Sequence, residues 1–217
     1  MKKIAVLFLS GLILYSCAKV PLTGRNQLAL VSNEEIQPLV DQQYDQVLKE
    51  DKVVTNTADG QKVLKVGRRM AEAVESYLVS QGYQELANSF DWEFNLLQSD
   101  QVNAWCMPGG KVAFYTGIMP LTQTETGIAV VMGHEIAHAV ASHSAERMSN
   151  GMLSELGVGV VSSAMGQNPT MTQAIFMQSV GIGSELGMLS FSRKHELEAD
   201  ELGLTFMAIA GYDPREA

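Results

Sequence analysis

Three residues in one short stretch could do chemistry together: His134, Glu135 and His138, in the sequence GHEIAH. Residues four apart in a helix lie one turn apart on one face, so the two histidines could bind one metal ion at about 2.0 to 2.1 Å. Glu135 is rotated by about 100° from His134, which puts it beside the open position of the ion, where a general base for an activated water belongs. The stretch predicts a catalytic metal site with two of its ligands.

A second stretch supplies candidates for the third ligand. A catalytic zinc usually takes three protein ligands and keeps a fourth position for water or substrate. In SRKHELEAD, residues 192–200, Glu196 and Asp200 share one helical face, whereas Glu198 lies on roughly the opposite side. We predict one Zn²⁺ per chain with Glu196 as the third ligand, and Asp200 as the acceptor of the spare N–H of a zinc-bound histidine. The alternative is that this acidic helix is an ordinary solvated surface.

Three more residues have side chains that could reach such a site. His143 follows His138 by five positions, off the ligand face by more than a right angle, so we expect a helix-end or surface residue. His195 adjoins Glu196 but faces elsewhere; a contact to a ligand or substrate is the minor alternative. Cys106 is expected to be a buried, inert thiol, with a zinc-binding thiolate as the alternative.

Hydrophobic periodicity predicts the elements that position these residues, in a mainly helical α+β domain with a small β-sheet. The expected elements are helices over about 32–50 and 59–79, short strands in DWEFNLLQS and KVAFYTG joined through a PGG turn, a helix over about 124–148 and a last helix from about Ser192. Residues 151–189 are almost uncharged but offer no run of roughly 20 apolar residues. We predict two core helices there, with a membrane-touching or mobile lid as the alternative.

The chain of 217 residues begins with MKKIAVLFLSGLILYSC, which has the layout of a secretory signal. LYSC resembles the lipobox of bacterial lipoproteins, so Cys17 is expected to carry lipid, although it could be merely a thiol near a cleavage site. We predict a signal peptide over 1–16, a lipidated extended tether leading into the domain over 17–31, and a catalytic domain over 32–217. Without an aspartate after the cysteine, the domain would face the periplasm from the outer membrane.

The net charge of the chain argues against a nucleic acid partner, and its cysteines argue against an intramolecular disulfide. Removal of Lys2 and Lys3 with the signal would change the formal charge from −9 to −11, so there is no electrostatic case for nucleic acid as a partner. Cys17 and Cys106 are the two cysteines of the chain, so a lipidated Cys17 would leave no intramolecular disulfide.

Three blocks, NAWCMPGGKVAFYTG, VVMGHEIAHAVASHSAERMS and FSRKHELEADELG, resemble in order the signature blocks of the HtpX-like and CAAX-prenyl-endopeptidase family of zinc metallopeptidases. The periplasmic lipoprotein and mitochondrial quality-control branches are the most similar, and with PLTGRNQLALVS the resemblance covers most of residues 20–213. It implies a zincin-type fold, zinc on His134, His138 and Glu196, Glu135 as the base, and Asp200 as the motif aspartate. Such proteins usually continue past the GYDP step, so either this chain is a C-terminally truncated fragment or it lacks the C-terminal elements of the family.

These observations predict a lipid-anchored zinc endopeptidase that cleaves unfolded or misassembled envelope proteins. We expect GKVAFYTG to be an edge strand to which an extended substrate adds at the positions Gly110, Lys111, Val112 and Ala113. The alternatives are a lipoprotein chaperone or assembly factor with a structural zinc, and a lipid-anchored scaffold without metal. The base position of Glu135 argues against the chaperone, because a purely structural site has no use for a base.

Overall fold

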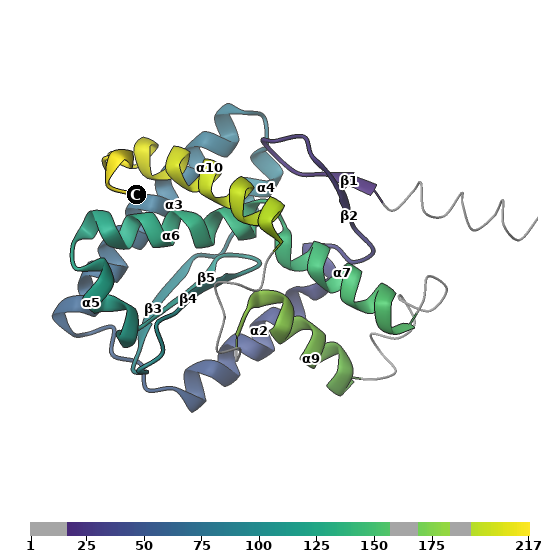
Figure 1. Ribbon diagram of the computed structural model, residues 1–217, viewed down its shortest axis with the longest axis horizontal. Helices are drawn as coiled ribbons and strands as arrows, with labels where there is room; N and C mark the ends of the chain where they lie inside the picture. The colour runs from purple at the N-terminus through teal and green to yellow at the C-terminus, as the bar shows by residue number, and fades with distance from the viewer. Residues whose placement is uncertain (1–16, 157–168, 183–191) are drawn as a thin grey trace, which may run out of the picture.

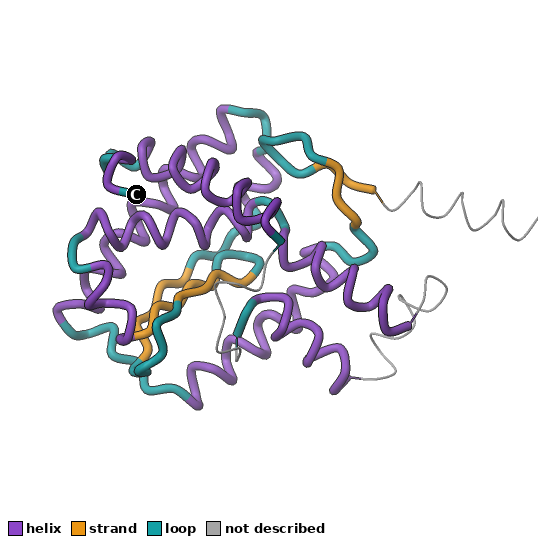
Figure 2. The backbone as a smooth tube through the Cα atoms, viewed as in Figure 1, coloured by secondary structure: helices purple, strands orange, loops and turns teal. Residues whose placement is uncertain are grey.

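The computed structural model describes residues 17–156, 169–182 and 192–217, and the predicted signal peptide and parts of the predicted core-helix region lie outside these ranges (Figure 1). The described part is mainly helical with two small sheets, which confirms the predicted α+β class (Figure 2). Its strands are β1 (Cys17–Lys19), β2 (Asn26–Leu28), β3 (Glu93–Leu97), β4 (Ala104–Met107) and β5 (Lys111–Tyr115). Its α-helices are α2 (Asn33–Glu50), α3 (Ala58–Ser80), α4 (Gln84–Asn88), α5 (Met119–Thr122), α6 (Glu125–Val140), α7 (His143–Leu156), α9 (Pro169–Val180) and α10 (Arg193–Ile209).

The first long helices form where local signals predict them. Ser32 caps α2, and Glu35 returns the bond to the backbone of Ser32 in a capping box. Thr57 caps α3 through its hydroxyl. The predicted apolar stripe of α3 is fully buried in the core: Val63, Val66, Met70, Val74 and Leu78. Within the described ranges, none of the helices combines the length and hydropathy needed to cross a membrane.

The three-stranded sheet lies between two groups of helices (Figure 1). One core packs α3, α6 and α10 on the face with Phe94, Val112 and Phe114. The other packs α2, α7 and α9 on the face with Trp105 and Ala113. Both faces are therefore buried, which explains why β4 and β5 consist of buried residues throughout.

The sheet order β3-β5-β4 corrects the expectation of an edge strand at residues 110–113. β5 is central, parallel to β3 and antiparallel to β4, a strand that the sequence analysis missed. Lys111, Val112 and Ala113 are buried and lie opposite residues of both neighbouring strands, while Gly110 lies in the preceding turn and accepts from the backbone of Glu93. A substrate cannot add to a strand that is already paired on both sides, so this prediction is wrong.

The helix expected over 124–148 is two helices. α6 ends at Val140 because Ser142 adopts a left-handed backbone conformation, with φ of 56°. The side chain of Asn33 donates to the Ser142 hydroxyl at 3.0 Å and holds this turn. The break changes the direction of the chain, and α7 starts at His143 and leads away from the end of α6 (Figure 1).

Helices α6 and α10 cross with their backbones in contact. A Cβ atom added to Gly203 would lie 2.9 Å from both the carbonyl carbon of Gly133 and the amide nitrogen of His134. Glycine at these two positions removes the side chains that would separate the helices. The first turn of α10 can therefore approach the histidines of α6.

Residues 17–31 do not form the expected extended tether. β1 and β2 pair as an antiparallel hairpin with Cys17 opposite Leu28. Val20 and Val31 are buried in the two cores, and β2 packs beside α7. The hairpin is therefore an integral part of the fold.

Candidate metal centre

The structure brings the three predicted ligands together. His134 and His138 stand one turn apart on α6, and Glu196 lies in the first turn of α10. One potential ligand atom from each residue lies within 4.8 Å of the others. The Nε2 atoms of the two histidines are 3.0 Å apart, and the carboxylate oxygens of Glu196 lie 3.4 Å and 3.8 Å from them.

The contacts of Glu196 and the two histidines fit a bound cation. The Oε1 atom of Glu196 is buried and has no hydrogen-bond partner within the part of the chain that the structure describes. A buried carboxylate oxygen without a partner is costly, and a metal ion would satisfy it. Two ligands of one tetrahedral zinc ion lie about 3.3 Å apart, close to the observed spacing of the histidine nitrogens. Two imidazoles and one carboxylate with an open position form a donor set that suits zinc.

Asp200 lies where the sequence predicts it. Its Oδ1 atom is 2.9 Å from His134 Nδ1, one helical turn after Glu196. A carboxylate at this position accepts the Nδ1–H and leaves the Nε2 lone pair of His134 directed at the centre. The side chain of Asp200 is 62% exposed, so the contact is made at the rim of the site.

Glu135 is buried beside the ligand set, with 7% of its surface exposed. Burial, and then the negative charge of Glu196, raise its pKa to about 8. A cation held by the ligands would act in the opposite direction and favour the carboxylate.

Cys106, on β4, is a buried free thiol, and burial followed by the charge of Glu135 raises its pKa well above the ordinary value. A thiol in these surroundings stays protonated, as expected for an inert residue.

His143 lies at a helix end, as the first residue of α7, but it is not a surface residue. It is completely buried, and its Nδ1 atom lies 2.8 Å from His138 Nδ1. Its Nε2 atom lies 2.9 Å from Glu198, and burial is the first cause that lowers the pKa of His143 to about 4. The prediction assumed a continuous helix, whereas the turn at Ser142 directs His143 back toward His138. The sequence contains no clear signal for this turn, because serine is not among the residues that commonly adopt a left-handed backbone.

A buried ionic cluster lies behind His138 and His143. Glu198 points away from the ligand face, as expected, but toward Arg25 of the hairpin instead of solvent. Arg25 also pairs with Glu146 at 2.9 Å, and Glu146 accepts from His195 at 3.0 Å. Burial opposes the ionisation of Glu146, but the hydrogen bonds from His195 and Arg25 outweigh it and lower its pKa to about 2.

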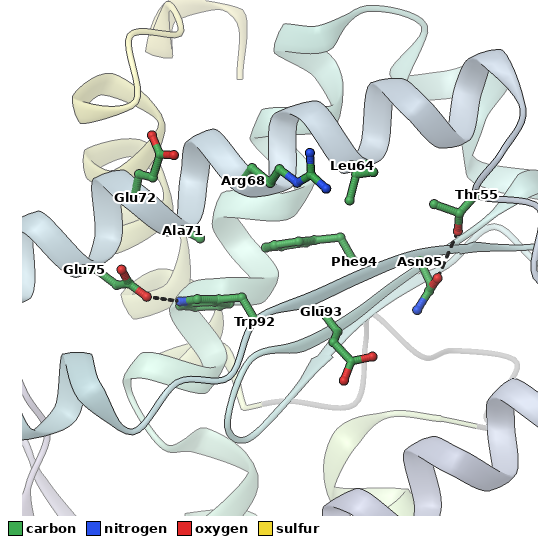
Figure 3. Close-up of a pocket in the computed structure, with 10 residues that line it drawn as sticks. All are labelled: Thr55, Leu64, Arg68, Ala71, Glu72, Glu75, Trp92, Glu93, Phe94 and Asn95. Carbon is green, nitrogen blue, oxygen red and sulfur yellow. Dashed lines mark hydrogen bonds between the residues drawn. The ribbon is translucent and has the colours of Figure 1, made fainter.

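A groove of about 570 Å³ between α6 and α10 opens beside the ligands. Its lining includes His134, Glu196 and Asp200 together with four apolar side chains: Val130, Val131, Leu204 and Met207. A second hollow of about 550 Å³ lies between α3 and β3 (Figure 3). There Trp92 donates to Glu75 at 2.8 Å, but the described residues that line the hollow include no histidine or cysteine. Of the two hollows, the groove beside His134 is the one lined by members of the group His134, His138 and Glu196, which could hold a metal ion.

Comparison with known proteins places the chain in one family. Residues 65–217 match the model of peptidase family M48. Metalloendopeptidase OMA1 of Arabidopsis thaliana is 36% identical over 127 residues, which are 58% of this chain and 24% of that protein. The human mitochondrial metalloendopeptidase OMA1 is 28% identical over 198 residues, 90% of this chain and 37% of that protein. A third relative, the beta-barrel assembly-enhancing protease of Escherichia coli O157:H7, is 31% identical over 129 residues, 57% of this chain and 26% of that protein.

The chain thus spans between about a quarter and somewhat over a third of the length of these relatives. The family match includes both helices of the candidate centre, α6 and α10, and such a family implies a bound metal. As the sequence motifs predicted, the chain belongs to peptidase family M48.

Proposed function

We propose that this chain is a zinc-dependent endopeptidase in which His134, His138 and Glu196 hold the metal and Glu135 is the general base. The observation that carries the proposal is the convergence of the three ligand side chains, with an unpartnered carboxylate oxygen of Glu196 among them. The metalloendopeptidase names of the relatives support the same reaction class.

Each residue then has a defined task in amide hydrolysis. Zinc, when bound, would polarise the scissile carbonyl group and make a water molecule acidic enough to react near neutral pH. Glu135 accepts the proton of the attacking water and then delivers it to the nitrogen of the leaving amine. Asp200 keeps the ring of His134 in the tautomer and orientation that a ligand needs. The burial of Glu135 keeps bulk water away from the proton that it carries.

The proposed substrates are extended polypeptide chains. The apolar walls of the groove beside His134 would accept an apolar side chain next to the scissile bond. Unfolded or misassembled proteins of the cell envelope expose such side chains, and the name of the Escherichia coli relative connects that protein with β-barrel assembly. We therefore propose that the substrates of this chain are proteins of the bacterial envelope. Lipid on Cys17 is the proposed membrane anchor, and no nucleic acid partner is proposed.

Metal analysis of purified variants tests the proposed ligand set. We expect about one zinc per wild-type chain, and loss of most of it in His134→Ala, His138→Ala and Glu196→Ala. Glu201→Ala is the matched control, because Glu201 is an exposed carboxylate on the same helix as Glu196. If Glu196→Ala keeps its zinc while Glu201→Ala or Glu198→Ala loses it, the ligand assignment is wrong.

A further inference from the structure

A series of hydrogen bonds leads from His138 away from the candidate metal centre. His138 Nδ1 lies 2.8 Å from His143 Nδ1, and His143 Nε2 lies 2.9 Å from Glu198 Oε2. Arg25 donates from Nε to the same oxygen at 2.6 Å. His143 and Glu198 are buried, and the side chain of Arg25 is 11% exposed. We call His143, Glu198 and Arg25 the anchoring chain, because they connect His138 with the N-terminal hairpin.

The donors and acceptors along this chain follow from one requirement. If the Nε2 lone pair of His138 binds a metal, the neutral ring carries its proton on Nδ1. That N–H can donate to His143 Nδ1, which must then accept. The proton of His143 is therefore on Nε2 and is donated to the carboxylate of Glu198. Every contact in the anchoring chain then has one donor and one acceptor. The anchoring chain therefore favours the tautomer of His138, with the proton on Nδ1, that a metal ligand needs.

Glu198 is held from its far side by the N-terminal hairpin. The Thr23 hydroxyl donates to one carboxylate oxygen of Glu198, and Arg25 donates to the other. Arg25 also pairs with Glu146, which accepts from His195. The ring of His195 stacks on that of His143, with centroids 4.3 Å apart and an angle of 21° between the planes. His143 is thus fixed both at its edge by Glu198 and on its face by His195.

We propose that His143 and Glu198, anchored by Arg25 of the N-terminal hairpin, are positioning residues that fix the orientation and tautomer of His138 and thereby set the affinity of the centre for its metal. The inference rests on the proposed metal binding by His138. It adds a second carboxylate-to-histidine contact to the one that Asp200 makes with His134. It also gives the hairpin a task at the centre, although Arg25 and Glu198 are 173 residues apart in the sequence.

The first measurement is the zinc dissociation constant of the full chain, obtained by competition with a chromophoric chelator. Glu198→Gln keeps the size of the side chain and removes its charge, and Arg25 retains Glu146 as a partner, so the variant should fold. Loss of a partner behind a ligating histidine typically weakens metal affinity about 10- to 100-fold. Glutamine can still accept from His143 but carries no charge, so we expect a loss at the lower end of this range. Glu201→Gln, an exposed carboxylate three residues further along the same helix, should bind zinc like the wild type.

The second measurement asks whether Glu198 acts through His143. His143→Phe preserves a buried ring but can neither accept from His138 nor donate to Glu198. In a His143→Phe background, the additional Glu198→Gln change should leave the zinc dissociation constant nearly unchanged, because the anchoring chain is already interrupted at residue 143. If Glu198 acted on zinc binding independently of His143, the two losses would multiply. The visible spectrum of the cobalt-substituted protein should also change in either single variant, since the bands depend on ligand geometry.

The third measurement tests the role of the hairpin. Arg25→Gln should weaken zinc binding in the same direction as Glu198→Gln, and Arg25→Lys should restore part of the affinity. Arg193→Gln, which changes an exposed arginine of α10, is the matched control and should have no effect. Thr23→Val, which removes one hydroxyl contact to Glu198, is a milder variant for the case that Arg25→Gln fails to fold, and a weaker loss is expected.

The outcomes separate this inference from the proposed function. If the wild-type chain binds no zinc, the proposed function fails and this inference fails with it. If the wild type binds zinc and Glu198→Gln binds it equally well, the inference alone is wrong. Equal zinc affinity of the wild type, Arg25→Gln and Thr23→Val would show that the hairpin has no part in positioning His138.

Discussion

Glu135 must be ionised to accept a proton, yet burial and the charge of Glu196 raise its pKa to about 8. The same surroundings would strengthen its interaction with a cation held nearby, because little water screens it. A base with a pKa near neutrality is well matched to proton transfer at neutral pH. In the proposed mechanism, the protein alone would keep Glu135 protonated, and an ion on the proposed ligands would release that proton.

Glu146 provides a test of the buried ionic cluster that is independent of catalysis. Its pKa of about 2 in the folded protein lies below the value of about 4.3 for an unfolded glutamate. The ionised side chain thus contributes stability that is fully present above pH 4.3 or so and is lost as the pH falls toward 2. We expect Glu146→Gln to lower the free energy of unfolding at pH 7, and the difference from wild type to shrink as the pH falls through this window.

Urea denaturation at several pH values, with a chelator present to exclude metal loss, measures this difference. Glu85→Gln, an exposed carboxylate on α4, serves as the control and should show no such dependence. A Glu146→Gln effect that is constant with pH, or that grows in acid, would contradict the assigned ion pairs with Arg25 and His195.

At the residue level, the sequence predicts what helical periodicity controls and misses what the tertiary fold controls. His134 and His138 share a face of α6, and Glu196 and Asp200 share one of α10, because spacings of four are local geometry. His143 escaped prediction because a left-handed residue breaks the helix before it. The partnership of Arg25 with Glu198 joins residues from opposite ends of the chain, and no local pattern encodes such a contact.

At the scale of elements, the centre depends on how closely α10 approaches α6. Gly133 and Gly203 allow backbone contact at the crossing, so that the first turn of α10 reaches the two histidines of α6. The spacing of apolar residues predicted both helices but not their crossing. The sheet order was missed for a related reason: β4 pairs antiparallel with β5, whereas the parallel pairing of β3 with β5 requires a connection that alternation cannot reveal.

Gly203→Ala tests the helix crossing. Alanine normally favours a helix interior by about 1 kcal/mol over glycine, but here its Cβ would lie 2.9 Å from backbone atoms of α6. We expect a destabilisation of about 1 to 3 kcal/mol, as for other overpacked interiors, together with weaker zinc binding as α10 shifts. Chemical denaturation and chelator competition measure the two effects.

Gly151→Ala on α7 is the matched control, since among the described residues its new methyl group would meet only a side-chain carbon of Ile175, at 3.0 Å. The control should change stability little in either direction. If Gly203→Ala proves as stable as the wild type or more so, backbone contact does not set the distance between α6 and α10.

For the whole molecule, the position of the hairpin limits how the domain could be anchored. β1 begins at Cys17, and Val20 is already part of the core, so a lipid on Cys17 would leave almost no linker. The hairpin that would meet the membrane is the one that supplies Arg25 to the cluster behind His138. An anchored chain would therefore hold its candidate metal centre at a nearly fixed position relative to the bilayer.

Expression of the wild type and Cys17→Ser in a bacterium that processes lipoproteins tests the anchor. The wild type should fractionate with membranes, and mass spectrometry should find an N-terminal Cys17 carrying lipid. Cys17→Ser should lose the modification while it keeps its zinc, because no ligand is altered. A wild-type chain that is unmodified and still begins at Met1 would exclude the anchor.

The most direct test of the account is amide cleavage by Glu135→Gln, with casein as an unfolded substrate. The substitution is nearly isosteric and leaves all three proposed ligands, so zinc content should stay close to that of the wild type. Cleavage should fall by about 10²- to 10⁴-fold, or roughly 3 to 5 kcal/mol of barrier, because an amide cannot accept the proton of the attacking water. If zinc-loaded Glu135→Gln cleaved casein at the wild-type rate, with contaminating protease excluded, the proposed mechanism would be contradicted. If both proteins bound unfolded substrates and neither cleaved them, the result would favour a chaperone.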